Sequence, residues 1–168
     1  MKKIILALAA VAVLAISCDN KSKELNEKFT QLMTQKDSLQ TVSADLQATF
    51  EKMTTMHKQM SEKINAMQPL DSSLLASLAE HEAAFTSQST VLEGQKKTFE
   101  GYVDLATNFA ALSAEEKEAQ INTIIENNTK MMEENTTLKT LQENMMKAHE
   151  GIMAKLNDTT ATTNTEKK

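Results

Sequence analysis

The chain has 168 residues, with 23 acidic side chains against 18 basic ones, all of them lysines, and a formal net charge of −5. Without arginine it lacks the bidentate guanidinium contacts that read phosphates and bases, so this acidic composition argues against nucleic-acid binding. Three glycines, one proline and no tryptophan, together with abundant Ala, Leu, Met, Glu, Gln and Lys, predict an all-α fold.

The N-terminal segment has the pattern of a secretory signal peptide over residues 1–17. Lys2 and Lys3 precede an apolar run over residues 4–16. This run is too short for a permanent transmembrane helix, because it would cover only about 20 Å of a hydrocarbon core roughly 30 Å thick. Ordinary signal-peptidase cleavage and lipoprotein processing would both cut directly before Cys18, the single cysteine of the chain.

The stretch LAISC, which ends at Cys18, resembles the lipobox of bacterial lipoproteins. In that family the cysteine carries a diacylglycerol on its thiol and an acyl chain on its amino group. The resemblance therefore implies a lipid-anchored membrane protein of the cell envelope that faces the periplasm or the cell surface, with residues 18–21 as anchor and short linker. The alternative is a secreted protein with a free terminal thiol, which is a liability in an oxidising compartment.

A seven-residue repeat predicts a first long helix over residues 21–68. One row of the repeat is apolar throughout: Leu25, Leu32, Leu39, Leu46, Met53, Met60 and Met67. The other row mixes apolar and polar residues: Phe29, Lys36, Ser43, Phe50, His57 and Ile64. Polar interior positions weaken a self-contained two-stranded coiled coil, so packing against other helices of the same chain is favoured.

Pro69 ends this helix, and Asp71 or Ser72 can cap a second one over residues 72–111. Its apolar residues again recur every seven positions: Leu78, Phe85, Leu92, Phe99 and Ala106. The predicted bundle therefore has a second helix that is antiparallel to the first, because the connection between them is too short to cross over.

Ser113 and Glu116 form a capping box that begins a third helix over residues 114–157. Its heptad row contains Ile124, Met131, Leu138, Met145 and Ile152. We expect an elongated antiparallel three-helix coiled-coil bundle over residues 22–157, followed by a disordered polar tail over residues 158–168. The alternative is an open long helix that assembles into an oligomeric coiled coil.

Methionines and histidines gather in one half of the predicted bundle. The candidate metal ligands are Met53, Met56, His57, Met60, His81, Met146, His149 and Met153. Thioether and imidazole groups suit Cu(I), although methionine is also an adaptable core residue. Counting residues from the two turns places His57 and His81 at one level and His149 about 9 Å beyond them. Copper is therefore a possible cofactor.

No motif predicts an enzyme. We expect a structural, spacer or protein-interaction role in the envelope. The alternatives are a metal-binding envelope protein and a periplasmic holdase whose methionine-rich stripe binds unfolded chains. The lipid anchor, the heptads and the terminal Lys168 resemble, in outline, the murein lipoproteins, whose last lysine is joined to peptidoglycan. The resemblance implies envelope proteins or peptidoglycan as possible partners beside the membrane.

Overall fold

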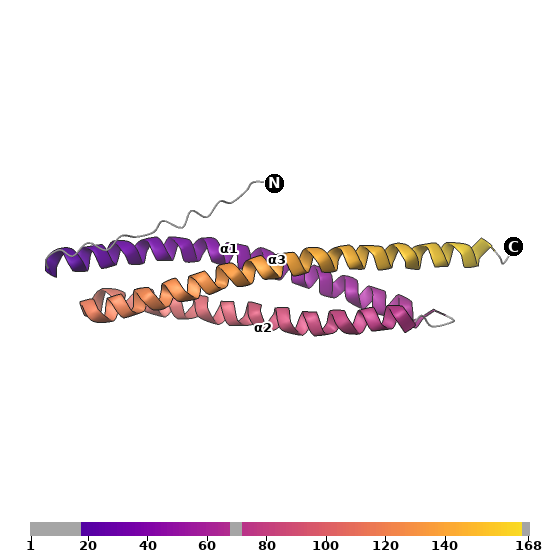
Figure 1. The fold of residues 1–168 in the computed structure, drawn as a ribbon, viewed down its shortest axis with the longest axis horizontal. Helices are drawn as coiled ribbons and strands as arrows, with labels where there is room; N and C mark the ends of the chain where they lie inside the picture. The colour runs from indigo at the N-terminus through magenta and orange to yellow at the C-terminus, as the bar shows by residue number, and fades with distance from the viewer. Residues whose placement is uncertain (1–17, 68–71, 166–168) are drawn as a thin grey trace.

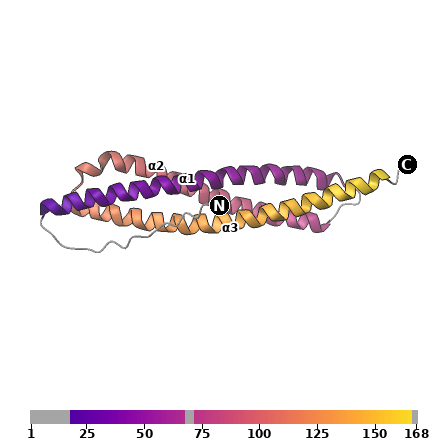
Figure 2. The same ribbon diagram turned by 90° about the horizontal axis from the view of Figure 1, so that it is seen from above.

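A computed structural model describes residues 18–67 and 72–165, and these form three long helices packed side by side. The elements are α1 (Cys18–Asn65), α2 (Ser72–Asn108), the 3-10 turn η1 (Phe109–Ala111) and α3 (Ala114–Thr165). Helices α1 and α3 run in the same direction along the rod, and α2, which lies between them in the sequence, runs in the opposite direction (Figure 1, Figure 2). The predicted all-α three-helix bundle is confirmed.

The start of the chain is described only from Cys18, where α1 begins, so the predicted signal peptide over residues 1–17 lies outside the described residues. The predicted anchor and linker, residues 18–21, are part of α1 in the structure. None of the described helices is long and apolar enough to cross a membrane.

The first connection follows Met67, and Pro69 and Asp71 lie outside the described residues. The last described turn tightens before this gap, because Met67 donates its N–H to the carbonyl of Ile64 at 3.1 Å, three residues earlier. Helix α1 therefore ends at Asn65, slightly before the predicted boundary at residue 68.

The predicted capping box at the start of α3 is confirmed. The backbone N–H of Ser113 donates to Glu116 Oε2 at 2.8 Å, and the backbone N–H of Glu116 donates to Ser113 Oγ at 3.3 Å. The Ser113 hydroxyl also donates to Glu116 Oε2 at 2.7 Å, and these contacts lower the pKa of the Glu116 carboxyl. The contacts pair backbone donors that a helix N-terminus otherwise leaves without an acceptor.

The far end of α3 differs from the sequence prediction. The helix continues to Thr165, so the predicted disordered tail is helical over residues 158–165, and residues 166–168 lie outside the described residues. This segment contains no glycine or proline to stop the helix. Extending an existing helix adds a backbone hydrogen bond for each residue, so propagation does not need the apolar periodicity that the tail lacks.

The heptad rows predicted from the sequence form an apolar core. Their buried members are Leu25, Leu39, Leu46, Met53, Met60, Leu78, Leu92, Phe99, Ile124, Met131, Leu138, Met145 and Ile152. Leu46, Leu92 and Leu138 meet in one cluster with a leucine from each helix, which shows that the three rows are in register. Ala106 belongs to the predicted row but is exposed, whereas Tyr102 and Phe109 beside it are buried.

A second buried row in each helix is polar in the middle of the bundle and apolar at its ends. Its buried polar members are Ser43 and His57 in α1, Gln88 and Gln95 in α2, and Asn128, Asn135, Gln142 and His149 in α3. At one end Ile64, Leu74 and Leu156 share an apolar cluster, and at the other end Phe109 packs with Ile121. This row therefore has apolar residues at both ends and a polar central segment.

Hydrogen bonds pair part of this polar segment. Asn128 Oδ1 accepts from the Tyr102 hydroxyl at 3.2 Å, and Gln142 Nε2 donates to the carbonyl of Leu46 at 3.0 Å. In contrast, Gln88 Oε1, Gln95 Oε1 and both amide atoms of Asn135 have no hydrogen-bond partner. Buried polar atoms without partners cost about 1–3 kcal/mol each, so the centre is less tightly stabilised than the apolar ends.

Candidate metal centre

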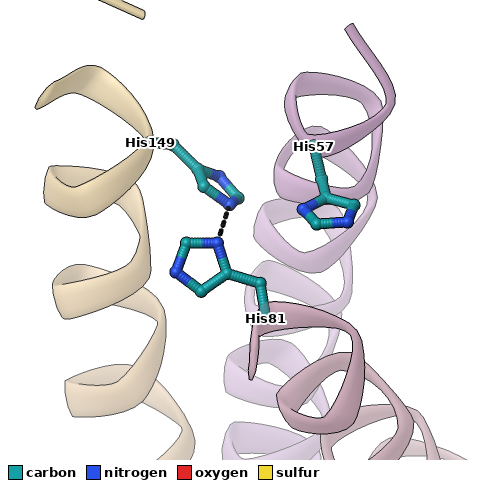
Figure 3. Close-up of side chains that lie close together, drawn as sticks. All are labelled: His57, His81 and His149. Atoms are coloured by element: carbon teal, nitrogen blue, oxygen red, sulfur yellow. Dashed lines mark hydrogen bonds between the residues drawn. The ribbon is translucent and has the colours of Figure 1, made fainter. Parts of the chain in front are cut away.

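The three histidines of the chain meet in the second buried row, each contributed by a different helix. His57 lies on α1, one heptad before Ile64; His81 lies on α2, one heptad after Leu74; His149 lies on α3. Because α1 and α3 are parallel and α2 is antiparallel to both, the same heptad spacing on each helix brings these positions to one level. Figure 3 shows the three rings facing one another across the interior of the bundle.

The histidine nitrogens are close enough to share one ion. One ring nitrogen of each histidine lies within 4.8 Å of those of the other two. His149 Nε2 and His81 Nδ1 are 3.0 Å apart, and the His57 ring centroid is 5.8 Å from that of His149 and 6.0 Å from that of His81. Nitrogens bonded to one ion at about 2.0 Å are roughly 3.3–3.5 Å apart, so small side-chain rotations would complete the site.

The predicted level of His149 is wrong, because this residue lies beside His81 rather than about 9 Å beyond it. The prediction placed the midpoint of the second turn near Leu112. In the structure Phe109 packs with Ile121, so residues of α2 and α3 that lie at the same level are equally far in sequence from Glu115 instead. The 3-10 turn and the extended residue Leu112 shift the start of α3 along the bundle, and this shift brings His149 level with the other two histidines.

Burial leaves several of these imidazole nitrogens without partners. His149 is fully buried and His57 nearly so, whereas His81 is partly exposed. His57 Nδ1, His57 Nε2 and His149 Nδ1 make no hydrogen bond. A neutral imidazole carries one N–H and one lone pair, and leaving them unpaired in the interior is unfavourable. A metal ion bound by the lone pair of one His57 nitrogen would satisfy that group; the His149 nitrogen that faces His81 is Nε2 rather than the unpaired Nδ1.

One phenylalanine ring and one carboxylate lie beside the site. Phe85 packs edge-on against His57 with centroids 5.2 Å apart, and it lies 6.1 Å from His149. Glu82 Oε1 is 3.8 Å from His57 Nε2, although the Glu82 side chain is 74% exposed. Metal-ligating histidines commonly direct their second nitrogen at a carboxylate, so this contact would leave His57 Nδ1 for the ion.

The predicted methionine ligands line the bundle around the histidines. Met53 and Met60 are fully buried, and Met56, Met146 and Met153 are partly buried. Met60 and Met153 pack into the apolar cluster of Ile64, Leu74 and Leu156, next along the bundle from the histidine layer. The structure thus brings the three histidines together directly and places the thioethers on adjacent turns. Metal ligation by the methionines stays a prediction.

Burial, and to a lesser extent mutual repulsion, lowers the pKa of two of the imidazoles, those of His81 and His149. Burial lowers the pKa of His149 to about 4, with smaller contributions from the charges of His81 and His57. Burial and the charge of His57 also lower the pKa of His81, against an opposing effect of Glu80. Deprotonated imidazole is the form that binds metals, so protons would not compete for His149 at neutral pH.

We expect the metal-free bundle to lose stability between about pH 6.5 and pH 4. In this window His149 takes up a proton in the unfolded chain, where its pKa is near 6.5, but not in the folded protein, where it is about 4. The unfolded state therefore binds more protons, and the free energy of unfolding falls by about 2–3 kcal/mol as the pH is lowered through this window. Urea unfolding in the presence of a chelator, at several pH values in this range, measures the change.

The matched control for this pH dependence is His149→Gln, which places at this position the residue found one heptad earlier at Gln142. The carboxylates of the chain affect the wild type and His149→Gln alike. The difference between the unfolding free energies of the two proteins therefore isolates the contribution of His149 and its two partner rings. A difference that stays constant, or that grows in favour of the wild type at low pH, contradicts the assignment of a neutral buried His149.

Comparison of the chain with protein-family models, with curated proteins and with solved structures finds no match. The chemistry of the site is therefore inferred from its own donors. Across residues 18–67 and 72–165, the three histidines are the group of His, Cys, Asp or Glu side chains close enough to share an ion. Imidazole donors suit Zn²⁺, copper, Fe²⁺ and Ni²⁺.

Sequence reasoning missed two features of this centre. Phe85 was predicted as a core residue only, but it also covers the imidazoles, and the polar row that continues from His149 through Gln142 and Asn135 was not recognised. The spacing that could have revealed this row is the seven-residue interval between Asn128, Asn135, Gln142 and His149. Cys18 is the first residue of α1, and its lipidation stays a prediction.

Proposed function

We propose that this protein is a lipid-anchored helical protein of the bacterial cell envelope that binds a transition-metal ion at His57, His81 and His149. The observation that carries the proposal is the convergence of three imidazoles, from three helices, with nitrogens within 4.8 Å of one another. Three separate helices must be in register to produce it. The lowered pKa values of His81 and His149 and the unpaired nitrogens of His57 support metal binding, in which the ion would replace the hydrogen bond between His149 Nε2 and His81 Nδ1.

The proposed role is binding rather than catalysis. His57 and His149 are buried, and the Phe85 ring packs against both, which leaves a substrate little access to the ion. The holdase alternative needs an exposed methionine stripe. We do not propose it, because Met53, Met60, Met131 and Met145 are enclosed in the bundle.

The envelope setting of the proposal rests on Cys18 and the segment before it. A lipid on Cys18 would hold the start of α1 at a membrane surface, and the last described residues of α3 lie at the opposite end of the rod (Figure 1). Such a rod suits a spacer or scaffold that meets envelope proteins or peptidoglycan away from the membrane.

A Cys18→Ser protein should leave the membrane fraction, and unchanged membrane attachment would contradict the anchor.

The metal site is tested by titrating Cu(I), under anaerobic reducing conditions, and Zn²⁺ into purified protein that carries Cys18→Ser. This change removes the thiol as a competing ligand. One ion should bind each chain, and losing one imidazole in His57→Ala or His149→Gln should weaken binding about 100-fold or more. Gln95→Leu is the matched control, because it changes a buried polar residue two heptads from His81 and leaves every imidazole in place. Binding of either ion that survives the loss of His57 and His149 together would contradict the proposal, as would no binding of either ion.

A further inference from the structure

We infer that the ion bound by His57, His81 and His149 is monovalent Cu(I) rather than a divalent metal. This inference rests on the proposed metal-binding function and names the ion that the site takes. It follows from the charge of the site, the number of its donors and the chemistry of the residues around it.

The charge of the site favours the smaller ionic charge. The three donors are imidazoles, which bind metal ions in their neutral form. The carboxylates that act on His57 and His81 are Glu82, whose side chain is 74% exposed, and the exposed Glu80, so water screens much of their charge. The cost of moving an ion from water into a low-dielectric interior rises with the square of its charge, so a divalent ion costs about four times as much as a monovalent one. A neutral buried site compensates little of that cost.

The donor number favours the same ion. A divalent zinc ion held by three histidines keeps a water molecule at its fourth position. A bound water also needs polar partners of its own. Phe85 contacts the histidine rings and Ile64 and Leu74 lie next along the bundle on one side, while the nearest buried polar residues of the row, Gln88 and Gln142, lie one heptad away on the other side. Cu(I) is a closed-shell ion that three donors in a plane can satisfy, so it requires no water.

The sulfur atoms near the site suit Cu(I) as well. Met53 and Met60 lie four residues before and three residues after His57, and Met145 and Met153 lie four residues to either side of His149. These spacings place the methionines on the histidine side of each helix. Thioethers are soft donors that select Cu(I), whereas divalent magnesium, calcium and manganese prefer oxygen, and zinc accepts thiolate, imidazole or carboxylate.

The test compares the affinities of Cu(I) and Zn²⁺ for the Cys18→Ser protein. Cu(I) is supplied from a coloured chelator complex under anaerobic reducing conditions, and Zn²⁺ is supplied from a second coloured chelator. We expect Cu(I) to bind at least 100-fold more tightly than Zn²⁺, and X-ray absorption should show three-coordinate copper with nitrogen donors. Gln95→Leu is the control that keeps all three imidazoles and the neighbouring methionines, and it should retain the Cu(I) affinity.

A second variant tests the charge argument directly. Phe85→Glu places a carboxylate against His57 and His149, and it should shift the ratio of affinities toward Zn²⁺ by at least tenfold; circular dichroism confirms that the helices remain. Zn²⁺ binding to the wild-type site as tightly as Cu(I), or an unchanged ratio in folded Phe85→Glu, overturns the inference and leaves the metal site standing. Failure of both ions to bind the wild type overturns the proposed function itself.

Discussion

Replacing Leu39 by alanine should lower the free energy of unfolding by about 2–5 kcal/mol. Leu39 is 2% exposed and belongs to a cluster with Phe99, Tyr102, Ile124 and Met131, which draws residues from all three helices. Alanine would remove buried apolar surface and leave a cavity, because the long helices cannot move inward at one position without disturbing the layers on either side. This loss of stability adds to the destabilisation that the unpaired polar atoms elsewhere in the core already cause.

Urea unfolding followed by circular dichroism measures this change as a lower midpoint at an unchanged slope. The matched control is Val103→Ala in α2, because Val103 is 60% exposed and its side chain should contribute only a few tenths of a kcal/mol. If Leu39→Ala and Val103→Ala destabilise the protein equally, then Leu39 does not lie in the core and the heptad register of α1 is wrong.

Saturating Cu(I) should raise the free energy of unfolding by about 4 kcal/mol when the free ion is about 1,000 times the dissociation constant. The three ligands come together only in the folded bundle, because His81 and His149 are 68 residues apart in the sequence. An ion that binds the folded state alone stabilises it by mass action. It would also give a partner to one of the buried His57 nitrogens that now lack one.

Thermal unfolding under anaerobic reducing conditions, with and without Cu(I), measures this stabilisation in the Cys18→Ser protein. In His149→Gln the bundle keeps a polar residue of the same row but loses a ligand, so its midpoint should respond only weakly to copper. A midpoint that rises equally in both proteins would mean that the ion binds elsewhere, for instance at methionines away from the histidine layer. No rise in the wild type would contradict a specific site.

The sequence by itself determined the three helices and their apolar rows. Seven-residue spacing is a property of one helix, and a buried leucine such as Leu39 or Leu138 has the same neighbours in its row wherever the partner helices lie. The start of α3 was equally local, since Ser113 and Glu116 are three residues apart and complete their capping box within one turn. The sequence also placed all three histidines in the same half of the rod.

Only the tertiary structure decided the level of each helix against the others. The heptad repeat states which face is buried but not which heptad meets which, and that choice depends on the geometry of the connection and on the fit of large side chains. The packing of Phe109 with Ile121 made this choice for α2 and α3. It moved His149 by nearly two helical turns relative to the count from the turn, to 3.0 Å from His81. A cluster of three histidines needs three helices in register, so the half of the rod that holds the candidate metal centre could be predicted from the sequence, but its geometry could not.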